Sequence, residues 1–217
     1  MKTVIFDMDG LLVDSESRAL TAWREVAKKY GIPGIDELFP RIIGTNTHTR
    51  GVIFDGCYGG KFPYTQCNEE VRSLAHSYEV ATPIPLKKGV RELLSYFREN
   101  GFKIAIASSG LLATIERRMK HHGIFEYFDV IVSGEMVKNS KPNPEIFLLC
   151  AAKLGVEPTE ITVFEDSPNG IKAAHAAGMR PVMVPDLVAP EKDVAALAYD
   201  VCSSLIEVKE KYESGSL

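Results

Sequence analysis

Short apolar segments that alternate with amphipathic stretches constrain the fold of this chain more than any other feature. Five segments have the length and composition of buried strands: residues 3–6, 103–107, 130–132, 161–164 and 181–184. Amphipathic stretches with a helical period lie among them, at residues 90–100, 111–122, 144–154 and 168–177. Strands that are apolar nearly throughout and alternate with helices are typical of a parallel sheet covered on both faces. The sequence therefore predicts an α/β fold built on a parallel sheet.

Residues 15–82, between the first two strands, do not follow this alternation. Helical regions are expected there at residues 17–30, 36–43 and 66–78, with a loop through residues 44–48. Pro83 and Pro85 stiffen the return to the sheet. We therefore expect two domains, an α/β core of residues 1–14 and 83–217 and an inserted all-α helical bundle of residues 15–82.

Composition narrows the classes of function. The chain has 217 residues, 45% of them hydrophobic, and a formal net charge of −4, so no basic surface indicates nucleic-acid binding. Its apolar runs are too short to cross a bilayer, and its N-terminus does not have the pattern of a signal peptide. We expect a cytoplasmic protein with neither nucleic acid nor a membrane as partner. The four cysteines include no CxxC pair, so neither a zinc site nor a disulfide framework is expected.

Polar side chains follow the predicted strands at the points where the strands end. Asp7 and Asp9 follow the first strand, Ser108, Ser109 and Gly110 follow the second, Glu165 and Asp166 follow the fourth, and Lys141 precedes the helix at residue 144. Ligands of an open parallel sheet bind at the carboxyl ends of its strands. We therefore expect these side chains to converge at one edge of the sheet.

Clustered carboxylates of this kind need a cation, because like charges repel and their burial is costly. Oxygen ligands without imidazole or thiolate favour Mg²⁺, which usually shares its coordination shell with a substrate phosphate. The ammonium of Lys141, the hydroxyl of Ser108 and the backbone N–H groups of Ser109 and Gly110 suit the remaining phosphate oxygens. The constellation thus predicts a site for a phosphoryl group on a magnesium ion.

The two aspartates after the first strand suit different steps of phosphoryl transfer. Asp7, at the end of the strand, can attack phosphorus and form an aspartyl-phosphate. Asp9, two residues on, can protonate the leaving alkoxide and later deprotonate water.

Four motifs in this order resemble those of the haloacid dehalogenase-like (HAD) hydrolases, a family with a Rossmann-like core. They are FDMDG, IAIASSG, SKPNPEIF and VFEDSPNGIKAAHAAG. The resemblance implies Asp7 as nucleophile, Asp9 as acid/base and metal ligand through its backbone carbonyl, Ser108 and Lys141 on the phosphate, and Glu165 and Asp166 at the metal. Asn169, within the fourth motif, is counted among the substrate-binding residues with Ser109 and Gly110.

The helical insert resembles the cap of the subgroup that contains β-phosphoglucomutase, phosphoglycolate phosphatase and pseudouridine-5'-phosphatase. In that subgroup the cap closes over the site, so His48 in the cap segment GTNTHTR is a candidate substrate contact. β-Phosphoglucomutases have a histidine in the first cap helix and an arginine in the cap loop, where this chain has Ala19 and Thr47. The resemblance therefore favours a Mg²⁺-dependent phosphatase of sugar or nucleoside phosphates over a phosphosugar mutase. We expect the protein to be a monomer.

Simpler interpretations of the same residues remain open. The Asp7–Asp9 pair alone could be a surface turn, or a metal pair of the calcium or glycosyltransferase type. Ser108 could serve only to cap the next helix. Glu165 and Asp166 could serve only to stabilise the N-terminus of the helix that follows them, through a favourable interaction with the helix dipole. His48 could lie in a solvated loop. A non-catalytic phosphate-binding module on the same fold is the alternative from a different functional class.

Overall fold

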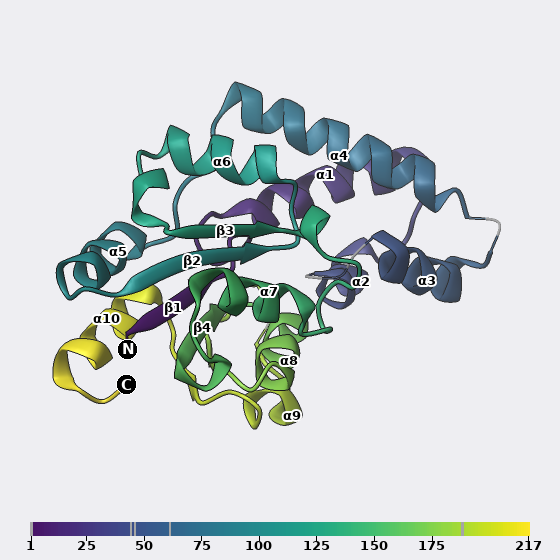
Figure 1. Cartoon of the computed structure of the whole chain (residues 1–217). Helices are drawn as coiled ribbons and strands as arrows, with labels where there is room; N and C mark the ends of the chain where they lie inside the picture. The colour runs from purple at the N-terminus through teal and green to yellow at the C-terminus, as the bar shows by residue number, and fades with distance from the viewer. Residues whose placement is uncertain (1, 44, 46, 61, 188) are drawn as a thin grey trace. The chain divides into compact units, whose positions relative to one another are not determined.

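The computed structural model describes residues 2–43, 45, 47–60, 62–187 and 189–217. In these residues six strands form one parallel sheet, in the order β3-β2-β1-β4-β5-β6 (Figure 1). The strands are β1 (Thr3–Phe6), β2 (Lys103–Ser108), β3 (Val130–Ser133), β4 (Ile161–Glu165), β5 (Arg180–Met183) and β6 (Asp200–Val201). The predicted α/β fold with a parallel sheet is confirmed.

The central position of β1 places its carboxyl end between the ends of two other strands. Phe6 is in register with Ile106 of β2 on one side and with Phe164 of β4 on the other. The residues that follow these three positions therefore lie side by side at the same edge, where ligands of open α/β sheets bind.

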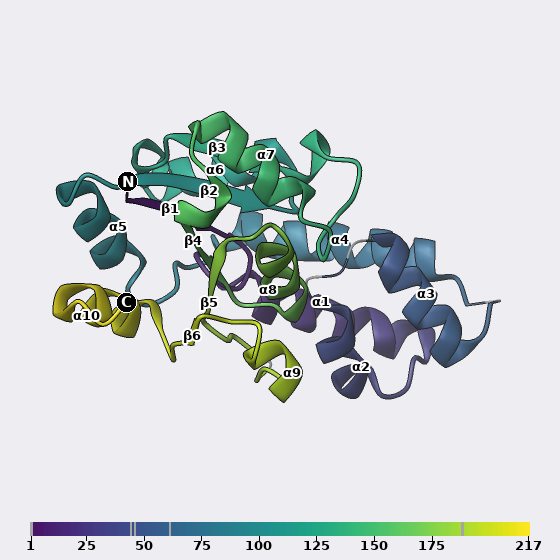
Figure 2. The same cartoon turned by 60° about the horizontal axis from the view of Figure 1, so that its bottom comes forward.

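Helices cover both faces of the sheet. They are α5 (Val90–Glu99), α6 (Leu112–His121), α7 (Glu145–Leu154), α8 (Pro168–Ala176), α9 (Lys192–Ala195) and α10 (Leu205–Ser214). On one face, α7 and α8 bury Phe147 and Ala173 against Ile5 of β1 and Val163 of β4. On the other, an aromatic core joins the sheet to α5 and α10, which lie side by side in Figures 1 and 2. There Phe97 packs 4.9 Å from Tyr212, centroid to centroid.

Residues 14–85 form a separate all-helical unit. Its helices are α1 (Ser15–Tyr30), α2 (Ile35–Ile42), α3 (Thr47–Tyr58) and α4 (Tyr64–Ala81). Trp23 of α1 stacks on Phe54 of α3 with ring centroids 4.9 Å apart, and both side chains are buried. The aromatic pair joins the first helix to the third, and α4 packs along α1.

The chain thus divides into two compact units, Met1–Val13 with Leu86–Leu217 and Asp14–Pro85. The expected insert, residues 15–82, starts one residue later and ends three residues earlier than the helical unit. Val13 and Leu86 are the last and first core residues on either side of the inserted unit. They form an antiparallel bridge, which holds the two connecting segments together.

Four of the helices and strands named above differ from the sequence-based expectation. The prediction of a loop through residues 44–48 is wrong for residues 47 and 48, because α3 begins at Thr47. Gly44 and Asn46 lie outside the described residues. The strand β6 and the helices α9 and α10 were not predicted. A strand of two residues is too short to show a pattern, and α10 is recognisable mainly by the Ser204–Glu207 spacing of its N-terminal cap.

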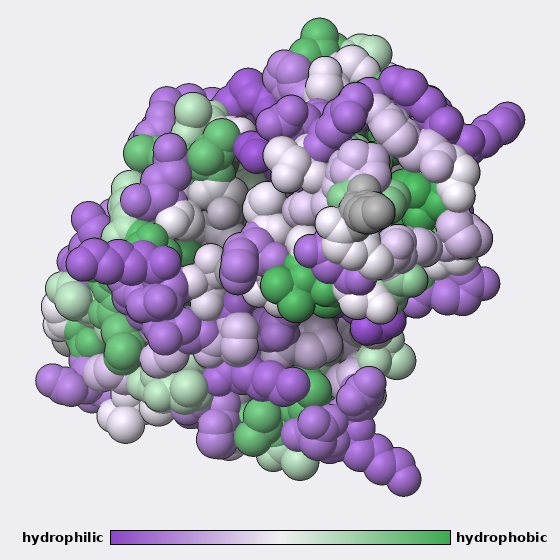
Figure 3. Space-filling view, turned by 90° about the vertical axis from the view of Figure 1, so that its right-hand side faces the viewer, coloured by the Kyte–Doolittle hydropathy of each residue, from purple (hydrophilic) through white to green (hydrophobic). Residues whose placement is uncertain are grey.

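The surface drawn in Figure 3 is mainly hydrophilic, with hydrophobic residues in small separate patches. No helix in the described part of the chain is both long and apolar enough to span a bilayer.

Candidate active site

Asp7 is the first residue after β1, and the backbone turns sharply just beyond it. Its backbone N–H donates to the carbonyl of Phe164 at 3.0 Å, which continues the pairing with β4 for one more residue. The turn then passes through Gly10, which has a φ of +80°. A Cβ at Gly10 would overlap the Asp166 carboxylate, so glycine is required both for the turn and for the close approach of Asp166.

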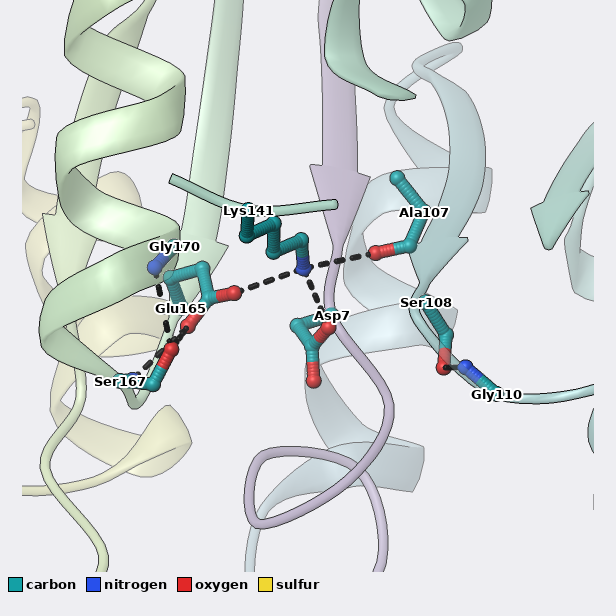
Figure 4. Close-up of polar contacts among 8 residues, drawn as sticks. All are labelled: Asp7, Ala107, Ser108, Gly110, Lys141, Glu165, Ser167 and Gly170. Atoms are coloured by element: carbon teal, nitrogen blue, oxygen red, sulfur yellow. Dashed lines mark hydrogen bonds and ion pairs between the residues drawn. The ribbon is translucent and has the colours of Figure 1, made fainter. Parts of the chain in front are cut away.

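Lys141 lies at the centre of the site, with three acceptors around its ammonium (Figure 4). Nζ donates to Asp7 Oδ1 at 2.5 Å, to Glu165 Oε1 at 2.8 Å and to the carbonyl oxygen of Ala107 at 3.0 Å. The side chain is only 3% exposed. An ammonium group has three hydrogen-bond donors, and leaving one of them unpaired in the interior is costly. Because all three are paired here, the arrangement holds Lys141 in one position. It ties together the ends of β1, β2 and β4.

The electrostatics of this cluster are dominated by burial. Burial, aided by the Glu165 and Asp9 carboxylates, raises the pKa of Asp7 from 3.8 to about 7, although Lys141 acts in the opposite direction. Burial also disfavours the ammonium of Lys141, but the Asp7 and Glu165 carboxylates outweigh it and raise the pKa of Lys141 above its ordinary value. One buried cation thus faces two buried carboxylates, so the cluster has too little positive charge to neutralise both of them.

Glu165 is held through both of its oxygens. Oε1 accepts from Lys141, and Oε2 accepts from the backbone N–H and the hydroxyl of Ser167 at 2.8 and 2.9 Å. Ser167 in turn is the N-cap of α8, because its Oγ accepts from the backbone N–H of Gly170 at 3.1 Å. A Cβ at Gly170 would overlap the Glu165 carboxyl group, so the first turn of α8 leaves space for this side chain.

The residues present fit a hard divalent cation. Asp7, Glu165 and Asp166 are all buried, and each offers a carboxylate oxygen within 4.8 Å of the other two. Carboxylate oxygens alone select Mg²⁺ or a similar cation, and the deficit of positive charge at Asp7 favours one. The side chain of Asp9 is not part of this group, and a contact of its backbone carbonyl with the metal stays a prediction.

Asp9 instead has a partner that sequence reasoning missed. Its Oδ1 accepts from Arg118 Nη1 of α6 at 2.6 Å. The two residues are far apart in the chain, and Arg118 lies in a run of basic residues at the end of a helix, where a helix dipole alone would explain it. No local pattern could have indicated this pair.

Ser108 does not cap the next helix. It is fully buried, and its Oγ accepts from the backbone N–H of Gly110 at 3.1 Å. The helix α6 begins only at Leu112, whose backbone N–H donates to Glu135 Oε2 at 2.9 Å. The N–H of Gly110, expected to face phosphate, is therefore engaged by Ser108 in this structure. Ser109 is exposed, and Asn169 lies half-buried in the first turn of α8.

His48 belongs to the helical unit, where it is exposed in the first turn of α3 rather than in a loop. Nearby, Arg50 Nη2 donates to the carbonyl of Thr45 at 3.0 Å. The cluster around Lys141 lies entirely within the core unit. A substrate contact by His48 stays a prediction.

Known proteins share both the sequence and the fold. The haloacid dehalogenase-like hydrolase family matches residues 1–178. The phosphorylated carbohydrates phosphatase of Thermotoga maritima is 37% identical over 182 residues, which cover 82% of each protein. Hexitol phosphatase B of Escherichia coli K12 is 35% identical, with 95% of this chain and 94% of that protein covered.

Among solved structures, β-phosphoglucomutase from Clostridium difficile matches with a TM-score of 0.78 at 27% identity, over 99% of this chain and 98% of that one. These similarities confirm the resemblance inferred from the four motifs. The chain is a hydrolase, and it belongs to the haloacid dehalogenase-like family.

Proposed function

We propose that this protein is a Mg²⁺-dependent phosphatase of sugar or sugar-alcohol phosphates that works through a phosphorylated Asp7. The observation that carries the proposal is the position of Asp7 at the end of β1, bound through Oδ1 to a buried lysine, with Asp9 two residues beyond it. Two of its relatives are named as phosphatases of phosphorylated carbohydrates and of hexitols, which supports this substrate class.

Asp7 is placed to attack phosphorus. Its Oδ1 is occupied by Lys141, and its second oxygen points away from the lysine in Figure 4. This second oxygen forms the new bond to phosphorus as the bond from phosphorus to the ester oxygen breaks. Lys141 keeps the carboxylate fixed and neutralises part of the negative charge that gathers at the site.

A divalent cation held mainly by Asp7 and Asp166 would supply positive charge to the phosphoryl oxygens and would favour the ionised form of Asp7. Glu165 is already bonded through both oxygens, so we assign it mainly to orienting Lys141 and Ser167. Ser108 and the adjacent backbone of Ser109 and Gly110 are the proposed phosphate contacts, with Asn169 on the side of α8.

Asp9 completes the reaction as the acid of the first step and the base of the second. In the first step its carboxyl group gives a proton to the departing ester oxygen, which leaves as an alcohol. In the second step its carboxylate takes a proton from water as the water oxygen attacks phosphorus and the bond to Asp7 breaks. Inorganic phosphate is released, and both aspartates return to their starting forms.

The test is hydrolysis of p-nitrophenyl phosphate by the purified protein with Mg²⁺ and after treatment with EDTA. We expect turnover with Mg²⁺ only, and a loss of more than about 10³-fold for Asp7→Asn. Asp193→Asn, which changes an exposed aspartate in α9, is the matched control and should leave turnover unchanged. Metal-independent turnover, or an active Asp7→Asn variant, would refute the mechanism.

The substrate class is tested with a panel of phosphate esters. Faster release of phosphate from hexose and hexitol phosphates than from nucleoside monophosphates supports the proposal. The reverse order would instead assign the protein to nucleotides. Conversion of β-glucose 1-phosphate to glucose 6-phosphate without release of phosphate would assign it to the mutases.

A further inference from the structure

The ion pair between Asp9 and Arg118 is a feature of the site that the reaction described above does not yet use. Arg118 Nη1 lies 2.6 Å from Asp9 Oδ1, and the arginine side chain is only 13% exposed. Charge-assisted hydrogen bonds of this length are strong and directional, and a partly buried pair is screened less by water than a surface pair. We propose that Arg118 is a positioning residue that aims Asp9 at the leaving oxygen of the substrate.

The orientation of the second oxygen of Asp9 supports this role. A Cβ built on Gly110 would lie 3.7 Å from Asp9 Oδ2 and 3.3 Å from Ser108 Oγ. Oδ2 therefore faces the segment after β2, where the phosphoryl group is proposed to bind, while Oδ1 is held by Arg118. The two oxygens of one carboxyl group are thus assigned different tasks.

This division of tasks matches the chemistry required of Asp9. The proton that is given to the leaving oxygen sits on Oδ2, and Oδ1 remains an acceptor for Arg118 in both protonation states. When Oδ2 later takes the proton from water, the same contact still holds the side chain. The side chain of Asp9 is 33% exposed, so without Arg118 its carboxyl group would be free to rotate toward solvent.

Arg118 differs from the basic residues next to it in α6. Arg117 is exposed, and Lys120 pairs on the surface with Glu116 at 2.7 Å. Favourable interaction with the helix dipole requires only a charge in the last turn, which Lys120 also supplies. Burial of one arginine against an aspartate of the site is a separate feature.

The inference rests on the proposed function and predicts a dependence on the leaving group. The quantity kcat/KM reports all steps up to departure of the leaving group, and p-nitrophenolate departs without help from an acid. For Arg118→Ala we expect kcat/KM to fall about 10- to 100-fold on alkyl phosphates such as hexitol phosphates, and less than about threefold on p-nitrophenyl phosphate. Arg118→Lys should recover part of the loss, and Arg117→Ala, the matched control, should behave as the wild type.

A double-mutant cycle separates positioning from direct binding of substrate. If Arg118 acts through Asp9, adding Arg118→Ala to Asp9→Asn should cost less than about threefold further on alkyl phosphates. A full additional loss in the double variant, or equal losses on both classes of ester, would overturn the proposal. Equal losses would assign Arg118 to binding the phosphate itself.

A second measurement does not depend on turnover. The urea midpoints of wild type, the two single variants and the double variant should be non-additive if the pair forms in solution. Additive midpoints would show that the two side chains do not interact, and would reject the positioning role. An inactive wild type would reject the proposed function instead, and the midpoints would still report on the pair.

Discussion

Lys141 is the cation that compensates the buried carboxylates of the site, because its single ammonium binds both Asp7 and Glu165. All three side chains are buried, so none of these charges is relieved by solvent. The position of the lysine follows from sequence only in part. The motif indicates its role, but the sharing of its three donors among the ends of three strands follows from the register of the sheet.

Lys141→Ala should strongly destabilise the metal-free protein, since it leaves two buried carboxylates without their cation. We expect a loss of about 3–5 kcal/mol in the free energy of unfolding at pH 8, measured by urea denaturation. Added Mg²⁺ should restore part of it. Lys138→Ala, which removes an exposed lysine nearby, should change stability by less than about 0.5 kcal/mol. Equal effects of the two variants would show that the buried network contributes little.

Gly170→Ala tests the space that α8 leaves for Glu165. The added methyl group would overlap the Glu165 carboxyl group, so the glutamate must move and lose its bonds to Lys141 and Ser167. We expect a loss of about 1–3 kcal/mol in unfolding free energy and slower phosphate release. Lys172→Ala, on the exposed side of the same helix, should do neither. A Gly170→Ala variant with wild-type stability would mean that the helix can shift without cost.

At the scale of elements, α3 shows how tertiary structure overrides local preference. The helix contains Gly51 and Gly56, which disfavour helix formation, and it follows a segment that looks like a loop. Packing explains why it forms. Phe54 is fully buried, and the centroid of its ring lies 4.9 Å from that of Trp23 and 5.2 Å from that of Tyr64. Gly51 lies so close to Tyr64 that a Cβ there would meet the ring at 3.1 Å.

The two glycines of α3 should therefore respond differently to alanine. At Gly56 an added Cβ meets nothing within 4 Å, so Gly56→Ala should raise the free energy of unfolding by about 0.5–1 kcal/mol. Gly51→Ala should gain less or lose stability, because Tyr64 must give way. Thermal denaturation of both variants provides the comparison. A larger gain at Gly51 than at Gly56 would contradict the packing described for this helix.

At the scale of the whole molecule, folding and metal binding are linked through Asp7. In the metal-free protein the pKa of Asp7 is about 7, well above its ordinary value of 3.8. The folded state therefore binds the proton more tightly than the unfolded state does. This contribution to stability is fully present below about pH 4 and is lost as the pH rises through about 7. A cation that binds ionised Asp7 competes with this proton.

Mg²⁺ should consequently raise the melting temperature more at pH 8 than at pH 5.5. Thermal scans with and without the ion at the two pH values measure this difference, and KCl at equal ionic strength controls for screening. An equal or smaller shift at pH 8 would show that Asp7 is not part of the metal site.

The sequence by itself determined the elements whose signal is local. Five strands, the helices α5, α6, α7 and α8 and the acidic residues after β1 and β4 could be predicted, because buried strands are apolar and ligands bind beyond their carboxyl ends. The order of the strands along the sheet, by contrast, depends on pairing between distant segments. So does β6, which has two residues and pairs with β5 at one edge of the sheet.

Only the tertiary structure decided which side chains meet. The contact between Arg118 and Asp9 joins the end of a helix to a turn far away in the chain, and neither residue has a neighbour in sequence that indicates the other. The double engagement of Glu165 depends in the same way on the space at Gly170 and on the placement of Lys141. Periodicity records which face of an element is buried. It does not record which buried or half-buried charges will face each other, since that depends on how separate elements pack.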